Sequence, residues 1–403
     1  MNKKIRIICL MLIITATSCK QVTESKPIRF DGLNEKPIEF IDTVKYEGFI
    51  IGADFNRDEV YIQTVSAGKG KYAISIVDIP SKKLKREMQL KTGGFESPTG
   101  FYNPSHMQFL DGNYIIVDQF HKILVFDEQL NHLYTNMFYQ LRYFLDFYMY
   151  ENQKFFVIGA KKNMFKFYRN NIRIYRLRKN SRPVHKKDLH VFSNKSLQPQ
   201  DLQNQKFMHK GEFWPSGKGF HKNGKIYYAN YDEKQYFRYD IRENKSVSFD
   251  LDYLKPKKFS QETADRFLFY HSNGWQDRIF RRDGIRVVAV PYSEPLYQFG
   301  IFDVGANKIG IIGDLDIETE DLKFRLDVLD ADSGKYLESV RFPFGDGILQ
   351  NIGDGARGMQ PTFINMDKGY YLWNNAVGED VIDYVHITTF KIKPDNTGTT
   401  GTK

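Results

Sequence analysis

The sequence predicts an all-β fold, a six-bladed β-propeller built from four-stranded antiparallel blades. Short apolar segments bounded by Gly, Asn and Asp recur along the chain in about six similar units. Aromatic residues make up 15% of the chain, and flat rings pack well on pleated strands. An extra strand-like segment, KPIEFIDT, precedes the first unit, and the last unit lacks its outer strand. Pairing these two segments would close the ring and cover two sheet edges.

The repeating unit is clearest in residues 111–136, where a polar turn precedes three apolar strands separated by acidic stops. Related strands form the first unit (DEVYIQTV, KYAISIVDI, KKLKREMQL), the third (QKFFVIGA, NNIRIYRL), the fourth (NGKIYYANY, QYFRYDI, KSVSFDL), the fifth (NKIGIIGDLDI, KFRLDVLDADSGK, YLESVRFP) and the sixth (KGYYLWNN, YVHITTFKI). Proline marks the entry of a further strand in NPSHMQFL, FWPSGKGF and QPTFINM, a position where no ladder hydrogen bond is lost. A β-sandwich or two smaller β-domains would use similar strands.

The propeller domain is expected over residues 38–393. Residues 20–37 are polar and predict a tether, and residues 394–403 predict a disordered tail. A helical pattern interrupts the repeat at residues 257–282, with Ser260 as a candidate N-cap. It predicts a short helix between the fourth and fifth blades, either on a binding face or as a cap on a blade.

The first 19 residues predict a lipoprotein signal peptide. Lys3, Lys4 and Arg6 precede a short apolar run, which is too short to span a bilayer comfortably. The run ends in ATSCK, where small residues before Cys19 resemble the lipobox of bacterial lipoproteins. That resemblance implies cleavage before Cys19 and lipid attachment to it, which would anchor the chain without a spanning helix. An ordinary signal peptide followed by a chance cysteine is the alternative.

Cysteine usage and net charge limit the catalytic, metal-binding and partner-binding roles that the mature chain could have. The only other cysteine, Cys9, lies in the predicted signal, so the mature chain would have no disulfide, cysteine metal site or cysteine nucleophile. Removing the three basic residues of the signal lowers the net charge from +9 to +6. That balance is modest for this length and does not require a nucleic-acid partner.

Taken together, the lipobox, the length and blades such as GNYIIVDQFHKILVFDEQLNHLYT resemble the TolB-like six-bladed β-propeller lipoproteins of Bacteroidetes. The resemblance covers nearly the whole mature chain. It implies a propeller held at the cell envelope by an N-terminal lipid, with the outer membrane as the expected location. It implies no particular ligand, because its motifs mark blades and not a chemistry.

Four residues are candidates for the rim of the central funnel: Tyr102, His106, Trp214 and Gln360. Tyr102 and Trp214 directly precede expected inner strands, where their rings could stack on a sugar or simply pack between blades. His106 lies on one such strand and could bind a ligand there. The alternative is that it is a hydrogen-bonded side chain that only fills space in the channel. Gln360 ends a glycine-rich loop on one face of the ring.

A basic blade is the second candidate surface. Residues 152–187 contain no Asp or Glu, and Lys161, Lys162 and Arg173 are its candidate contacts for anionic headgroups, acidic glycans or an acidic protein. Aromatic residues interleave with the basic ones, as in nucleic-acid sites, but an exported lipoprotein seldom meets nucleic acid. A solvated face balanced by the rest of the ring is the alternative.

Signals for catalysis or cofactors are missing from the sequence pattern. Asp314, Asp316, Glu318 and Glu320 alternate along one strand and could hold Ca²⁺, but the spacing of a dedicated calcium loop is lacking and a solvated strand edge is favoured. No G-x-S-x-G elbow, phosphate-binding loop or paired-histidine helix occurs. We therefore expect no cofactor, no metal and no catalytic residue.

These observations favour a non-catalytic binding or scaffold module of the cell envelope, with a protein or glycan as its partner. The alternative is a propeller hydrolase or lyase with a metal at the axis. Its ligands would come from distant blades, so sequence spacing does not exclude it.

Overall fold

The computed structural model describes residues 24–66, 71–90, 100–101, 104–118, 122–137, 144–151, 154–160, 169–178, 181–191, 219–230, 235–254, 301–316, 323–343, 363–377 and 382–394. Every regular element in these ranges is a β-strand, which confirms the all-β prediction. Within them, no helix is long and apolar enough to cross a bilayer. Cys19, the helix expected at residues 257–282 and the tail from residue 395 onward lie outside the described residues.

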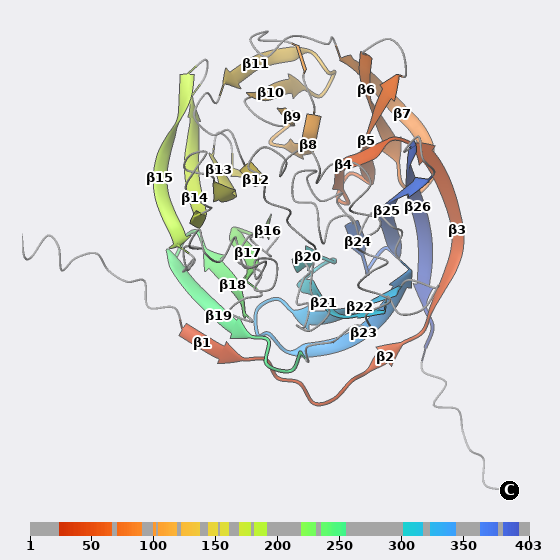
Figure 1. Ribbon diagram of the computed structural model, residues 1–403, viewed down its shortest axis with the longest axis vertical. Helices are drawn as coiled ribbons and strands as arrows, with labels where there is room; N and C mark the ends of the chain where they lie inside the picture. Colours follow the sequence, from red (N-terminus) through yellow and green to blue (C-terminus); the bar gives the residue numbers. More distant parts are fainter. Residues whose placement is uncertain are drawn as a thin grey trace, which may run out of the picture.

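Six sheets contain all of the described strands, and Figure 1 shows them arranged around a common centre. The first three hold β4 (Phe49–Asp54), β5 (Glu59–Ser66), β6 (Lys71–Asp78) and β7 (Lys83–Leu90); β8 (Pro104–Leu110), β9 (Asn113–Asp118), β10 (Lys122–Asp127) and β11 (His132–Met137); and β12 (Phe144–Glu151), β13 (Lys154–Ala160), β14 (Arg169–Arg178) and β15 (Ser181–Val191).

The other three hold β16 (Gly219–Lys222), β17 (Lys225–Asn230), β18 (Gln235–Asp240) and β19 (Lys245–Asp250); β20 (Ile301–Asp303), β21 (Lys308–Asp316), β22 (Lys323–Asp330) and β23 (Tyr336–Pro343); and β24 (Phe363–Asn365), β25 (Tyr370–Val377), β26 (Ile382–Ile392) and β3 (Ile38–Glu47). Below, these sheets are numbered one to six in this order. Their four-stranded antiparallel meanders are propeller blades, as predicted.

Neighbouring sheets touch through their innermost strands. β4 contacts β8, β8 contacts β12, and the series continues through β16 and β20 to β24, while β25 and β26 contact β4. Gly52 on β4 shows how close the approach is, because a Cβ there would lie 1.9 Å from the Met107 carbonyl oxygen of β8. Only glycine fits at this position without displacing a backbone.

The sixth sheet takes its outer strand from the other end of the chain. β3 pairs antiparallel with β26, from Glu47 opposite Tyr384 to Ile38 opposite Ile392. Midway along the pair, the hydroxyl oxygens of Thr43 and Thr388 lie 3.1 Å apart. The segment KPIEFIDT therefore lies on the sheet for which the sequence proposed it.

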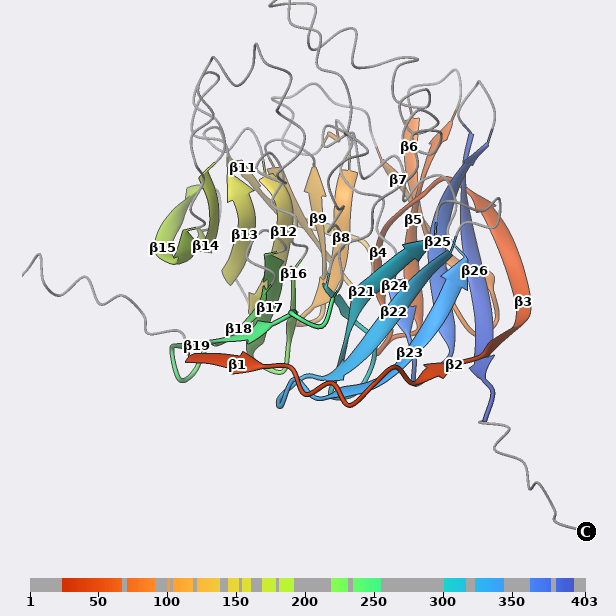
Figure 2. The ribbon, with the colours of Figure 1, turned by 60° about the horizontal axis from the view of Figure 1, so that its bottom comes forward.

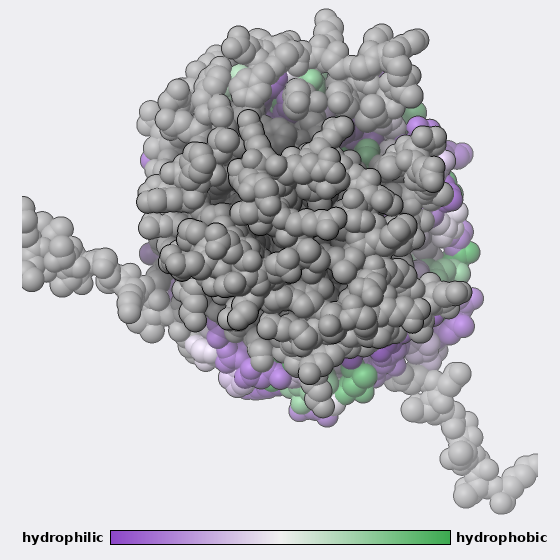
Figure 3. All heavy atoms as spheres, viewed as in Figure 1, coloured by the Kyte–Doolittle hydropathy of each residue, from purple (hydrophilic) through white to green (hydrophobic). Residues whose placement is uncertain are grey.

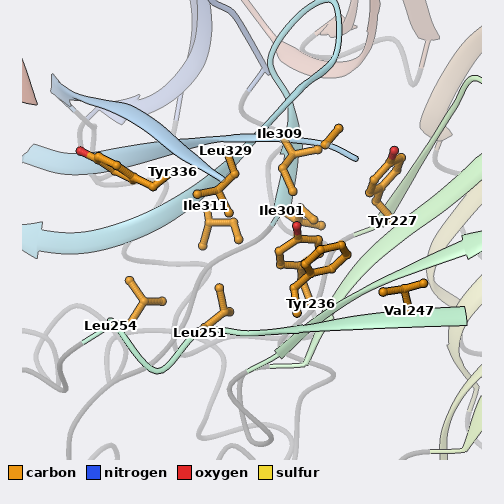
Figure 4. Close-up of a cluster of buried hydrophobic side chains, with 12 residues drawn as sticks. Tyr227, Tyr236, Val247, Leu251, Leu254, Ile301, Ile309, Ile311, Leu329 and Tyr336 are labelled. Atoms are coloured by element: carbon orange, nitrogen blue, oxygen red, sulfur yellow. The ribbon is translucent and has the colours of Figure 1, made fainter. Parts of the chain in front are cut away.

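The hydrophobic core lies between the sheets. Ile51, Tyr61 and Ile74 of the first sheet pack with Met107, Tyr114 and Leu124 of the second. A matching cluster joins the fourth and fifth sheets, with the side chains of Tyr227, Tyr236, Ile309, Ile311 and Leu329 gathered between the two (Figure 4). Inner and middle strands such as β9 and β10 are buried on both faces, so they are apolar on both sides.

The expected tether is shorter than residues 20–37. β1 (Glu24–Pro27) pairs parallel with β19, and β2 (Glu35–Lys36) pairs parallel with β23, so the fourth and fifth sheets have five strands. Figure 2 shows β1 and β2 following the outer edges of these two sheets. We call residues 24–36 the N-terminal strap. Its strands are too short and too polar to produce a periodic signal.

The two faces of the ring differ in their connections. Because strand direction alternates, the hairpins between first and second strands and between third and fourth strands lie on one side, the hairpin face. Two of them turn on Asp111–Gly112 and Asn223–Gly224, all four residues at positive φ, as tight hairpin turns require. The strand ends from which the chain passes between sheets lie on the opposite side, the connection face.

Candidate functional site

Of the predicted site residues, His106 is the one whose side chain the structure describes. It lies half-buried on β8, the innermost strand of the second sheet, as expected for a residue near the axis. Arg173 lies on β14 opposite Val157 and Asp188, with only its backbone placement described. Cys19, Tyr102, Lys161, Lys162, Trp214 and Gln360 lie outside the described residues.

A buried ion pair lies at the connection-face end of the second sheet. The Lys122 ammonium is 3.7 Å from an Asp118 carboxylate oxygen, and the two side chains are 2% and 3% exposed. The ammonium also donates a hydrogen bond to the Gly100 carbonyl oxygen. Burial lowers the pKa of Lys122, while the charge of Asp118 and its hydrogen bond act in the opposite direction.

This pair fixes the chain just before Tyr102. Gly100 is tied to Lys122, and the Phe101 ring stacks on Phe126 with 6.2 Å between ring centroids. A lysine with a lowered pKa can act as a base or nucleophile. Here its ammonium faces Asp118 and Gly100 and is almost fully buried, so its role in this structure is to hold the entry to β8.

The row of residues containing His106 crosses the whole second sheet. His106 pairs with Val117, Val117 with Ile123, and Ile123 with Asn136. Their alternating neighbours Met107 and Leu124 pack on the first sheet, so this row points to the third. Asn136 is fully buried, and its side-chain amide has no hydrogen-bond partner among the described residues. Sequence reasoning missed it, since an Asn near a strand end is ordinary.

The hairpin face carries a compact charged cluster between the first and second sheets. Glu59 is fully buried, and its carboxylate accepts hydrogen bonds from Lys85 at 2.8 Å and Arg57 at 3.1 Å. Arg57 also donates to Glu128 at 2.8 Å and lies 3.7 Å from the centre of the Phe109 ring. Burial alone would raise the pKa of Glu59, but the hydrogen bonds from Lys85 and Arg57 outweigh it and lower the pKa.

Further ion pairs run from hairpin to hairpin around the same face. Lys222 of the fourth sheet pairs with Asp303 of the fifth at 2.5 Å, and Lys308 of the fifth with Asp367 of the sixth at 3.0 Å. Lys368 of the sixth sheet pairs with Asp58 of the first at 2.7 Å. Each cation reaches forward to an acid of the next sheet, as Arg57 does toward Glu128. Many charges of the hairpin face are thus neutralised within the ring.

The acidic strand of the fifth sheet is only partly solvated. Asp327 on β22, the strand paired with the one that carries Asp314 and Asp316, is fully buried. Its carboxylate accepts hydrogen bonds from Arg325 at 2.7 Å, Ser339 at 2.6 Å and the Tyr253 hydroxyl at 3.2 Å. Burial alone would lower the pKa of Arg325, but the hydrogen bonds and charge of Asp327 raise it.

The proposed calcium ligands are not brought together by the described strands. Asp314 on β21 lies 3.5 Å from Arg341, which also binds Glu35 of the strap at 2.8 Å. Glu318 and Glu320 lie outside the described residues. Within the ranges given above, no group of three or more His, Cys, Asp or Glu side chains could hold a metal ion.

No protein-family model matches the chain, and no curated protein does. Among solved structures it is similar to a protein from Bacteroides fragilis described as exported, at 10% identity and TM-score 0.45, covering 93% of this chain and all of that one. A DUF4221 family member from Bacteroides vulgatus is similar at 14% identity and TM-score 0.45, covering 90% and 99%. BamB from Moraxella catarrhalis is similar at 9% identity and TM-score 0.33, covering 84% of each chain. These TM-scores are below 0.5 and support no functional statement.

Proposed function

We propose that this chain is a lipid-anchored, non-catalytic binding or scaffold propeller of the cell envelope, of the TolB-like lipoprotein kind. In this proposal the six sheets are the blades of one closed ring. Cys19 carries the lipid at the outer membrane, and an envelope protein or glycan binds on the connection face. The predicted signal sequence and lipobox support the location.

The difference between the two faces is the observation on which the binding role depends. Hairpin-face cations such as Lys222, Lys308 and Lys368 are paired with acids of neighbouring sheets. The long segments between sheets all start and end at the connection face: residues 91–103, 192–218, 251–300 and 344–362. Long connections on one side of a repeat scaffold are the usual place for ligand contacts.

The candidate contacts fall in these connections. Tyr102, Trp214 and Gln360 belong to three of them, and His106 begins an inner strand just beyond the first. Lys122 and Asp118 support the base of that first connection by holding Gly100. The basic residues Lys161 and Lys162 lie between the end of β13 and the start of β14, both of which are at the connection face, and Arg173 follows on β14. An aromatic rim with basic groups beside it suits an acidic glycan or an acidic protein segment.

Site-specific photocrosslinking in cells tests this proposal. A photoreactive residue at Tyr102 or Trp214 is expected to give discrete crosslinked products. The same residue at Lys83 or Leu133, which are exposed at hairpin-face strand ends, is expected to give none. Products confined to Lys83 and Leu133 would contradict a binding role for the connection face.

A further inference from the structure

We infer that the N-terminal strap fixes which edge of the ring lies at the membrane: the outer edge of the fourth sheet, beside β1 and β19. The inference rests on the lipid attachment at Cys19 in the proposed function. It adds an orientation, which lipid attachment through a free tether would not provide.

The first half of the strap is built into the fourth sheet. Glu24, Ser25, Lys26 and Pro27 lie in parallel register with Val247 to Asp250 of β19. The Ser25 hydroxyl donates a hydrogen bond to Asp250 at 2.8 Å. Residue 24 is therefore held near the start of β19, directly after the hairpin at residues 241–244.

The strap is anchored by an aromatic side chain at its centre. The Phe30 ring stacks on Tyr253 with 4.9 Å between centroids and meets the edge of Tyr336 at 4.8 Å. Phe30 and Ile28 pack against the buried cluster between the fourth and fifth sheets. Both side chains are partly buried there, so apolar contact adds to strand pairing in holding the strap on the ring.

The second half of the strap is tied to the fifth sheet. The Asn34 backbone N–H donates to the Tyr336 hydroxyl at 2.9 Å, and the Asn34 carbonyl accepts from the Ser339 N–H at 2.8 Å. Arg341 donates to Glu35 at 2.8 Å. Contacts along its whole length make the strap part of the ring and not a linker.

The length of chain left over decides the orientation. Residues 20–23 alone separate Cys19 from β1, and an extended chain spans about 3.3–3.6 Å per residue, so residue 24 lies within about 17 Å of the lipid-bearing residue. A free tether over residues 20–37 would reach about 60 Å and allow any orientation. The strap thus places the outer edge of the fourth sheet next to the lipid headgroups.

The opposite side of the ring must then lie far from the bilayer. The first sheet, with β7 at its outer edge, lies across the ring from the fourth (Figure 1). A compact chain of this length has a radius of gyration of about 21 Å, so that edge lies roughly 50 Å from the edge of the fourth sheet. The connection face, at the other end of β19 from residue 24, remains open to partners in this orientation.

Energy transfer to labelled lipids tests the orientation in the full lipidated chain. A lipid-modified Cys19 has no free thiol and the mature chain has no other cysteine, so Glu243→Cys and Lys83→Cys each accept one donor dye. Both residues are exposed and lie at hairpins between third and fourth strands, of the fourth and first sheets respectively. In phosphatidylethanolamine–phosphatidylglycerol vesicles with a headgroup acceptor, transfer from residue 243 should be several-fold stronger. Equal transfer, or stronger transfer from residue 83, would overturn the orientation.

Two further variants separate this inference from the proposed lipid anchor. About twelve Gly/Ser residues inserted after residue 23 leave the strap untouched but add a flexible reach of about 20 Å, and the difference between the two positions should largely disappear. A difference that survives the insertion undiminished would mean that the short spacer does not set the orientation. Cys19→Ser should abolish vesicle binding, and vesicle binding that survives it would contradict lipid attachment, whichever edge faces the bilayer.

Discussion

Replacing Asp327 with alanine is expected to lower the free energy of unfolding by about 3–5 kcal/mol. The fully buried carboxylate holds Arg325, Ser339 and Tyr253, and its loss leaves a largely buried guanidinium and two polar groups without their acceptor. Chemical denaturation of both proteins measures the difference. The network also joins β22 to Tyr253, where the chain leaves the fourth sheet, so the damage should extend across the contact between the two blades.

The matched control is Glu338→Ala, on the neighbouring strand β23. Glu338 is only partly buried, and a change within about 0.5 kcal/mol is expected for it. If Asp327→Ala were as mild as Glu338→Ala, the buried carboxylate would not be holding the fifth blade against the fourth.

The stability of the chain is expected to fall by about 3 kcal/mol between pH 6.5 and pH 4 because of His386 alone. His386 on β26 is 7% exposed, and its ring stacks on Trp373 of β25 with 4.0 Å between centroids. Burial, helped by the charge of Lys45 on the adjacent strand β3, lowers the pKa of His386 to about 4. The folded-state pKa of His386 lies below its unfolded value, so the unfolded chain binds this proton more readily than the folded chain does. The free energy of unfolding is therefore highest above pH 6.5 and decreases as the pH falls toward 4.

Denaturation across this pH range with the His386→Phe variant isolates the effect. Phenylalanine keeps a ring against Trp373 and removes the titration, so the variant should lose much less stability over the same interval. His132→Gln, at an exposed histidine on β11, is the matched control. If the free energy of unfolding depended on pH equally in the variant and the parent chain, His386 would bind a proton as readily in the folded state as in the unfolded state.

Most of the blade strands could be predicted because they are apolar and bounded by turn residues. The Asp111–Gly112 and Asn223–Gly224 turns, together with the apolar runs in β9, β17 and β25, locate hairpins from local chemistry alone. The pairing of KPIEFIDT could also be predicted. This segment has no sheet of its own and the last unit lacks an outer strand, so pairing the two covers both exposed edges.

The strap could not be predicted from the same signals. Its two strands hold four and two residues, ESKP and EK, which carry no apolar alternation. Its position depends on Phe30 meeting Tyr253 and Tyr336, residues more than two hundred positions away. A polar sequence with Pro and Ser predicts a tether until that long-range aromatic contact is known.

Buried charges were the second feature that local pattern missed. Asp327 is flanked by Leu326 and Val328 in an apolar run, and Glu59 alternates with Tyr61 and Gln63, which are both buried. A lone acid on the buried side of a strand is therefore a usable signal for an internal salt bridge. Its partners can be found only when the strands of the blade are assembled, since Arg57 reaches Glu59 from the β4–β5 hairpin and Lys85 reaches it from β7.

Closure of the ring by β3 is the claim on which both the proposed function and the membrane orientation depend, and a disulfide measures it most directly. Thr43 and Thr388 are directly opposite each other with their hydroxyl oxygens 3.1 Å apart, and the mature chain has no competing thiol. Under mild oxidation, the Thr43→Cys/Thr388→Cys variant is expected to form an intramolecular disulfide in nearly all folded molecules and to show a raised Tm. Free thiols at both positions in the folded chain would contradict pairing of the N-terminal strand with the last blade.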